Sequence, residues 1–316
     1  MDVSRIVQVV LFAVQLLLTM FGNGFLLMLL WKLKQTRRSA SMNFIFSCAL
    51  ADLTSAMINI PLAMDYMILK SGGLNGTVSP AVVIFMILFL IPLTFNSTLM
   101  IMVDRMLIVK CPVKYNNKMK VKKARIGIVF MWLTTLLFTG IINTSQMISD
   151  PPRVDDNPIE FMARLLKSGG SLRILLPICA IFLSSVAFTT MLYRGLQTLL
   201  KAKINSTTDN SAETLRAKTQ RQMIASSSRT ALIVMIIYLV SFFPAMIDAL
   251  LRFFEVTLPI SESNLAFVVL FFGQMSSFMN PYVFILRSTA LRQAAIKFIV
   301  TNSRNDIVVP IHRIRR

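Results

Sequence analysis

Seven long apolar runs set the strongest limit on what this chain can fold into. They lie at residues 6–31, 42–69, 79–109, 124–147, 171–200, 227–254 and 264–286. A helix needs about 20 apolar residues to cross a bilayer. Only 15% of the residues are charged, whereas a soluble domain has about 25%. The sequence therefore predicts an all-α membrane protein, a bundle of seven transmembrane helices.

The positive charges gather in alternate connecting segments. Most of the 33 Lys and Arg residues follow the first, third, fifth and seventh runs. Cytoplasmic loops of membrane proteins are enriched in Lys and Arg, so we expect an extracellular N-terminus and a cytoplasmic C-terminus. Topology and contact with anionic lipid then explain the net charge of +19, and a nucleic-acid partner is not expected.

The chain after the seventh run has two parts. At about residues 288–300 the pattern predicts an amphipathic helix on the inner membrane surface, with Leu291 and Phe298 on its apolar face. Residues 301–316 form a basic cytoplasmic tail. Residues 1–300 are therefore expected to form a single membrane domain.

Polar side chains inside the apolar runs are candidates for function, because a charge in a bilayer is costly unless it has a partner. Asp52 is a lone acid deep in the second run, and Asp104 and Arg105 form a pair near the end of the third. We expect five mid-span polar residues to converge on Asp52: Asn23, Thr94, Ser276, Ser277 and Asn280. Such a cluster is either a water-filled network of hydrogen bonds or a site for a hard cation, which prefers oxygen ligands.

Each of the seven runs carries a short motif. In order, the motifs are Gly22-Asn23, Leu50-Ala51-Asp52-Leu53, Asp104-Arg105-Met106, Trp132, Pro177, Phe242-Phe243-Pro244 and Asn280-Pro281-Tyr282-Val283-Phe284. One motif alone is weak evidence, but all seven in this order resemble the rhodopsin-like (class A) G-protein-coupled receptors. The resemblance covers about Gly22 to Phe298. It implies a plasma-membrane receptor that binds an extracellular ligand and activates a heterotrimeric G protein, with arrestin as a second intracellular partner.

The resemblance also implies roles for individual residues. Arg105 would pair with Asp104 in the inactive state and contact the G protein in the active state. The activation switch would also include Phe242, Pro244, Asn280, Pro281 and Phe284. The cluster around Asp52 would hold a sodium ion, and the resemblance implies no other cofactor.

The chain departs from the family's pattern where the switch is restrained. Met106 replaces an aromatic residue, Phe284 lacks the usual tyrosine hydroxyl, and residues 223–226 include no acid that could bind Arg105. Pro80 stands where the family has the cysteine of an outer disulfide. We therefore expect a weakly restrained switch that gives measurable basal signalling.

The residues that would face a ligand are mostly apolar. Ile87 stands where amine receptors have an acid, so we expect a small hydrophobic or weakly polar ligand rather than a biogenic amine. Candidate ligand contacts are Asp65, Met86, Ile87, Arg173, Asp248 and Gln274. Asn75 is a candidate glycosylation site in the first outer loop. Residues 110–119 are also similar to the second inner loop of olfactory receptors, so a chemosensory role stands beside a peptide or lipid one.

Other classes of membrane protein fit the sequence less well. A transporter or channel, the main alternative, would show inverted repeats with broken helices in paired positions, and no internal repeat is seen. An enzyme is not expected, because the sequence shows no paired catalytic acids or nucleophile motif, and His312 is its single histidine. Cys48, Cys111 and Cys179 do not have the spacing of metal ligands.

Overall fold

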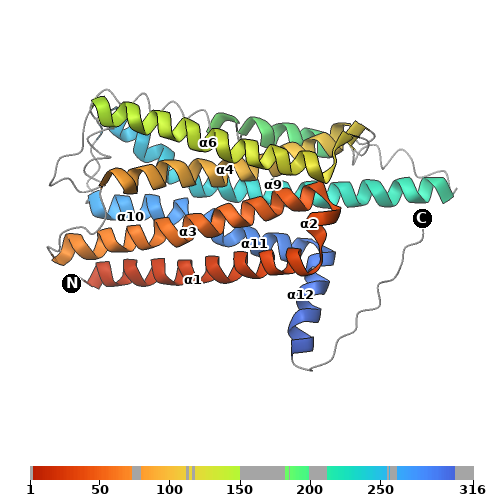
Figure 1. Ribbon diagram of the computed structural model, residues 1–316, viewed down its shortest axis with the longest axis horizontal. Coiled ribbons are helices and arrows are strands. Elements are labelled where there is room, and N and C mark those ends of the chain that lie inside the picture. Colours follow the sequence, from red (N-terminus) through yellow and green to blue (C-terminus); the bar gives the residue numbers. More distant parts are fainter. Residues whose placement is uncertain are drawn as a thin grey trace.

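The computed structural model describes the greater part of the expected bundle. The described residues are 3–72, 80–111, 114–115, 118–149, 182–184, 186–198, 212–254, 256 and 262–302. Almost all of them are helical, and the long helices lie side by side with similar axis directions (Figure 1). The prediction of an all-α fold is confirmed.

The helix bounds follow the apolar runs closely. The helices are α1 (Val3–Lys32), α2 (Gln35–Arg38), α3 (Ala40–Gly72), α4 (Pro80–Lys110), α6 (Val121–Ser149), α9 (Ala212–Phe253), α10 (Glu262–Gly273), α11 (Met275–Arg287) and α12 (Thr289–Asn302). Residues 182–184 and 186–198 are also helical and lie within the expected fifth run. The apolar span at Ile224–Leu251 lies close to the predicted run 227–254, and its helix, α9, extends beyond it because it begins at Ala212.

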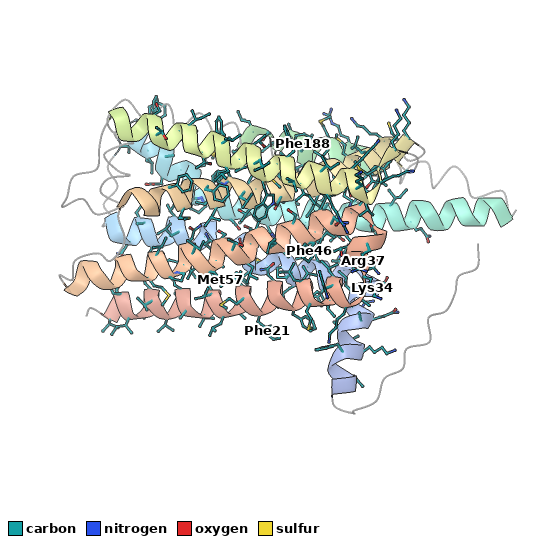
Figure 2. All side chains as sticks on the ribbon, viewed as in Figure 1. Phe21, Lys34, Arg37, Phe46, Met57 and Phe188 are labelled. Carbon is teal, nitrogen blue, oxygen red and sulfur yellow. The ribbon has the colours of Figure 1, made fainter. Side chains whose placement is uncertain are left out.

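Among the described residues, six helices are long and apolar enough to cross a membrane. They span Val3–Lys32, Ala40–Met64, Phe89–Lys110, Val121–Ile142, Ile224–Leu251 and Asn264–Arg287. Large apolar side chains remain exposed along them, for example Phe21 on α1, labelled in Figure 2, and Phe130 on α6. Soluble monomers rarely expose extended apolar patches, whereas lipid tails cover such a surface.

The seventh run, predicted at 264–286, spans Asn264–Arg287 and contains a break between two helices. α10 ends at Gly273, Gln274 forms a turn, and α11 begins at Met275. Glycine weakens a helix, and the Gln274 side chain bonds Ser55 of α3, with Oγ–Oε1 and Nε2–Oγ distances of 3.4 Å and 3.3 Å. The break therefore lies where helix propensity is low and a neighbouring helix offers a polar partner.

α1 and α11 approach closely because Gly22 has no side chain. A Cβ at Gly22 would lie 2.8 Å from Cγ of Pro281 and 3.2 Å from the Tyr282 ring. Tyr282 Oη also donates a hydrogen bond of 3.1 Å to the Leu18 carbonyl of α1. This contact brings the polar residues of α1 to the backbone of α11.

α12 turns steeply away from the bundle axis (Figure 1). Its apolar face includes Leu291, which is buried, and Phe298, whose ring centroid lies 5.9 Å from that of Phe25 on α1. Lys32 Nζ lies 4.3 Å from the centroid of the Phe298 ring. Lys297 is exposed. A helix after the seventh span is thus present, with Leu291 and Phe298 packed toward the bundle.

Candidate functional site

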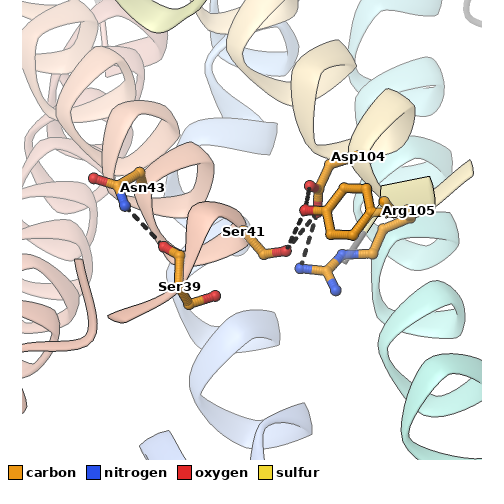
Figure 3. A network of polar contacts seen from close by, with 6 residues as sticks. Ser39, Ser41, Asn43, Asp104 and Arg105 are labelled. Carbon is orange, nitrogen blue, oxygen red and sulfur yellow. Dashed lines mark hydrogen bonds and ion pairs between the residues drawn. The ribbon is translucent and has the colours of Figure 1, made fainter. Parts of the chain in front are cut away.

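Asp104 and Arg105 lie on the last turns of α4, and side chains from two other segments converge on them. Asp104 Oδ2 accepts a hydrogen bond of 2.7 Å from Ser41 Oγ at the start of α3. Asp104 Oδ1 accepts one from Tyr115 Oη. Arg105 Nη2 lies 3.5 Å from Asp104 Oδ2. We call these four residues the Asp104 cluster; Figure 3 labels Ser41, Asp104 and Arg105.

The Asp104 carboxylate is only 2% exposed. A buried carboxylate requires hydrogen-bond donors or a cation, and both oxygens of Asp104 have partners. Burial of Tyr115 and the charge of Asp104 both raise the pKa of the Tyr115 phenol. The phenol therefore keeps its proton at neutral pH and can donate it to the carboxylate.

Arg105 is bound less tightly than Asp104. Its 3.5 Å contact with Asp104 is longer than the distance of about 2.8 Å that is usual for a charge-assisted hydrogen bond. Arg105 is nevertheless buried at 9% exposure. The acid is thus fixed mainly by two hydroxyl donors, while the arginine has a loose ion pair.

A second network positions Ser41 at the junction of α2 and α3. Asn43 Nδ2 donates to the carbonyls of Thr36 and Ser39 at 2.7 Å and 2.8 Å, the latter bond being visible in Figure 3. Arg125 of α6 donates to Asn43 Oδ1 at 3.3 Å and to the Thr36 carbonyl at 3.2 Å. The basic end of α6 therefore supports the turn that carries Ser41 to Asp104.

A separate polar cluster surrounds Asp52, which is 1% exposed within α3. From α11, Ser277 Oγ donates to Asp52 Oδ1 at 3.0 Å, and Asn280 Nδ2 donates to Asp52 Oδ2 at 2.9 Å. Cys48 Sγ, one turn away on α3, donates to Oδ2 at 3.7 Å. Two of the five expected partners thus contact the carboxylate, together with one thiol that was not expected.

Asn23 contacts the backbone of α11 rather than Asp52. Its Nδ2 donates to the Ser277 carbonyl at 2.8 Å and to the Thr19 carbonyl at 3.1 Å. Ser277 stands four residues before Pro281, which has no N–H to donate to the Ser277 carbonyl. Asn23 supplies the missing donor.

The other two expected partners do not hydrogen-bond Asp52 in the described structure. Thr94 Oγ1 donates to the carbonyl of Ile91 on its own helix at 2.9 Å, and Ser276 is buried on α11. Among the described residues, the side-chain oxygens of Asn23 and Asn280 are buried without a protein partner. The Asn280 oxygen belongs to the amide that bonds Asp52, and an unpaired acceptor next to a carboxylate suits a hard cation or water.

Aromatic residues connect α9 to α4 near these clusters. The ring centroid of Tyr238 lies 5.2 Å from that of Phe95 on α4 and 5.8 Å from that of Phe242. Phe242 and Phe284 belong to the same buried apolar core. Pro244 lies within α9 and is half-buried. Phe242 of α9 and Phe284 of α11 thus share one apolar core with Phe95 of α4.

The expected ligand contacts are only partly described. Met86 packs against a small core around Leu90, and Asp248 is half-buried on α9. Gln274 bonds Ser55 and so joins a polar cluster on α3. Three of the expected ligand contacts lie outside what the structure describes, namely the side chains of Asp65 and Ile87 and the residue Arg173. Asn75, the candidate glycosylation site, also lies outside it.

Sequence reasoning missed four residues of these clusters, namely Ser41, Cys48, Tyr115 and Tyr238. A signal existed for Cys48, because it stands one helical turn before Asp52. Tyr115 follows the Asp-Arg motif in the inner segment, but its contact with Asp104 depends on the path of a connection. Nothing in the sequence distinguished Ser41 from the other small polar residues of the inner segments.

Comparison with known proteins gives one family. The model described as 7 transmembrane receptor (rhodopsin family) matches residues 22–284. This range includes both polar clusters and all seven motifs. No curated protein matches the chain.

Proposed function

Because the chain belongs to the rhodopsin family of seven-transmembrane receptors, we propose that it activates a heterotrimeric G protein through the Asp104 cluster. Members of this family are signalling receptors rather than enzymes. One observation carries the proposal: Arg105 is buried on α4 and, among the described residues, has one loose ion pair, to an acid that Ser41 and Tyr115 also bond. Such an arginine can change partners without leaving the Asp104 carboxylate unpaired.

The activation step proposed for this geometry is a shift between two populations. A ligand acts only through its different affinities for the two states. In the closed state Arg105 pairs with Asp104. In the open state the Ala212 end of α9 lies farther from α4, and the Arg105 guanidinium faces the G protein. Pro244 removes a helical hydrogen bond within α9 and makes that helix easier to bend.

The proposal includes an orientation in the plasma membrane. The Arg105 end faces the cytoplasm, where basic residues are enriched, and Lys114, Lys118 and Lys120 are exposed there. The opposite half binds a small hydrophobic or weakly polar ligand near Met86 and Asp248. A more specific version of the proposed function is a chemosensory role, which the similarity of residues 110–119 to olfactory receptors supports.

We also propose a sodium ion at Asp52. The residues that would hold it are Asp52, Ser277 and Asn280, whose oxygens include the unpaired Oδ1 of Asn280. The ion would supply a positive charge that stabilises the buried carboxylate. Asn23 would keep its position on the Ser277 carbonyl and so hold α11 against α1.

A cell assay of G-protein recruitment across a library of small apolar ligands tests the proposed function. We expect recruitment by the wild type and its loss in Arg105→Ala, measured at matched surface expression. Arg5→Ala is the control, because Arg5 lies in the first turn of α1, at the end of the bundle opposite to Arg105. Ligand-dependent transport or current without any recruitment would contradict the proposal.

A further inference from the structure

The seventh span contains two places where helical hydrogen bonding is interrupted. One is the break at Gly273 and Gln274 between α10 and α11, and the other is Pro281 inside α11. The last four carbonyls of a helix have no intrahelical donor, and Phe271 is among the last four residues of α10. A proline leaves the carbonyl four residues earlier without its usual donor.

α1 supplies a side-chain donor at each place. Asn23 bonds the Ser277 carbonyl, as described above, and Gln15 Nε2 donates to the Phe271 carbonyl at 3.0 Å. Gln15 is 2% exposed. A carbonyl in the hydrocarbon region that lacks a partner costs several kcal/mol, so this donor has a strong local effect. The orientation of the Gln15 amide is fixed, because a carbonyl accepts only from the amide nitrogen.

The break also has room to move. A Cβ placed at Gly273 would meet nothing within 4 Å, and glycine restricts the backbone less than any other residue. On its other side the break is held by the bonds between Gln274 and Ser55 of α3. The break is therefore a flexible point that side chains from α1 and α3 hold in one geometry.

We propose that Gln15 is a positioning residue that fixes the Gly273–Gln274 break through the Phe271 carbonyl, and so sets where α11 presents Ser277 and Asn280 to Asp52. Both of these α11 residues contact the Asp52 carboxylate. A change at the break alters the position of α11 relative to α10. Its consequence for signalling rests on the proposed function, whereas its effect on the break does not.

Hydrogen exchange measured by mass spectrometry on the purified full-length protein tests the proposal. Gln15→Met removes the donor with little change in volume. We expect the backbone amides of residues 272–276 to exchange about fivefold faster, the change that corresponds to one net hydrogen bond. Equal exchange in Gln15→Met and the wild type would overturn the proposal.

Gln8→Met is a matched control. Gln8 is also buried on α1 and also donates to α10, but its Nε2 bonds the side-chain Oδ1 of Asn264 at 2.9 Å rather than a carbonyl at the break. We expect Gln8→Met to leave the exchange of residues 272–276 unchanged. The same acceleration in both variants would show a general loosening of α1 and would overturn the assignment to Gln15.

Gly273→Ala tests the break in the opposite direction and does not disturb α1. Because its Cβ meets open space, it should slow the same amides about two- to fivefold, as expected for replacing glycine in a helix. Gly140→Ala in α6, where a Cβ also meets nothing within 4 Å, should not change them. Faster or unchanged exchange in Gly273→Ala would contradict a flexible break.

The basal and ligand-stimulated recruitment of G protein by these variants gives a second readout. We expect Gln15→Met to change the ratio of basal to maximal recruitment at least about threefold, and Gln8→Met to leave it unchanged. A receptor that recruits no G protein in any form would remove the proposed function, while hydrogen exchange would still decide the role of Gln15. Altered exchange with an unchanged ratio would overturn the link to Asp52.

Discussion

Tyr115 donates its phenolic hydrogen bond to Asp104, the same carboxylate that holds Arg105. The segment after α4 is thereby tied back to the helix that carries the switch. Ser41 adds a donor from α3. The Asp104 charge is therefore shared among three side chains, and the ion pair with Arg105 is the longest of the three contacts.

The Tyr115 hydroxyl should restrain the switch. Tyr115→Phe removes one hydrogen-bond donor to Asp104. This loss strengthens the attraction between Asp104 and Arg105, but it also frees the segment that positions Asp104. We expect the second effect to dominate, because Tyr115 connects two segments. Basal G-protein activation should rise about fivefold, the equivalent of about 1 kcal/mol. Tyr193→Phe, at an exposed tyrosine whose hydroxyl accepts a hydrogen bond from Gln197 of its own helix, should leave basal activation unchanged. A fall of basal activation in Tyr115→Phe would contradict this prediction.

The same phenol predicts a pH dependence of stability. The folded-state pKa of Tyr115 is raised above its ordinary value of about 10, so the native state holds this proton more tightly than the unfolded state. The stabilisation is complete below about pH 10 and is lost as pH rises toward the folded pKa. Thermal unfolding between pH 7 and pH 11 should show a steeper loss above pH 10 in the wild type than in Tyr115→Phe. Parallel profiles would count against this prediction.

The close packing of α1 on α11 should make Gly22 sensitive to substitution. In Gly22→Ala the new Cβ would lie 2.8 Å from Cγ of Pro281, a rigid ring that cannot rotate away. We expect a loss of stability of about 1–3 kcal/mol, as for other overpacked sites, measured as thermal unfolding in detergent. Gly24→Ala is the control, since a Cβ there meets nothing within 4 Å. Equal stability of the two variants would show that α1 shifts freely.

The proposed ion at Asp52 predicts a cation dependence. At a sodium concentration about tenfold above the dissociation constant, binding should stabilise the wild type by about 1.4 kcal/mol. We expect unfolding temperatures to be higher in sodium chloride than in N-methylglucamine chloride at equal ionic strength. Asp52→Asn should remove the difference. A wild type with the same unfolding temperature in both salts would leave water as the content of the cluster.

The sequence predicts the spans well, because the length and hydropathy of a membrane helix are local properties. It also predicts the contact of Asp52 with Ser277 and Asn280, because polar residues at a similar depth in the membrane are stabilised by bonding each other across neighbouring helices. It does not predict the break at Gln274, because Gly273 looks like any small residue in an apolar run. The contact of Tyr115 with Asp104 depends on the path of a connection, for which periodicity carries no information.

Asn23 was expected to contact Asp52 but bonds the Ser277 carbonyl instead, and the reason for this difference is similar. The sequence shows which side chains are polar, but it does not show which backbone carbonyls lack a donor until the helix geometry is known. Pro281 creates one such carbonyl and the end of α10 another, and Asn23 and Gln15 bond them. An amide side chain that faces a helix with a proline or a break should therefore be predicted to bond a backbone carbonyl of that helix before a side chain.

Whether Tyr115 and Asp104 restrain Arg105 can be measured as the rate of GDP release from a purified heterotrimeric G protein, with the receptor in lipid nanodiscs and no ligand added. We expect a faster rate with Tyr115→Phe than with the wild type. We also expect the double variant Tyr115→Phe/Arg105→Ala to return to the rate of G protein alone. A double variant that stays as fast as Tyr115→Phe would contradict the account, because Arg105 would then not be the group that Asp104 and Tyr115 restrain.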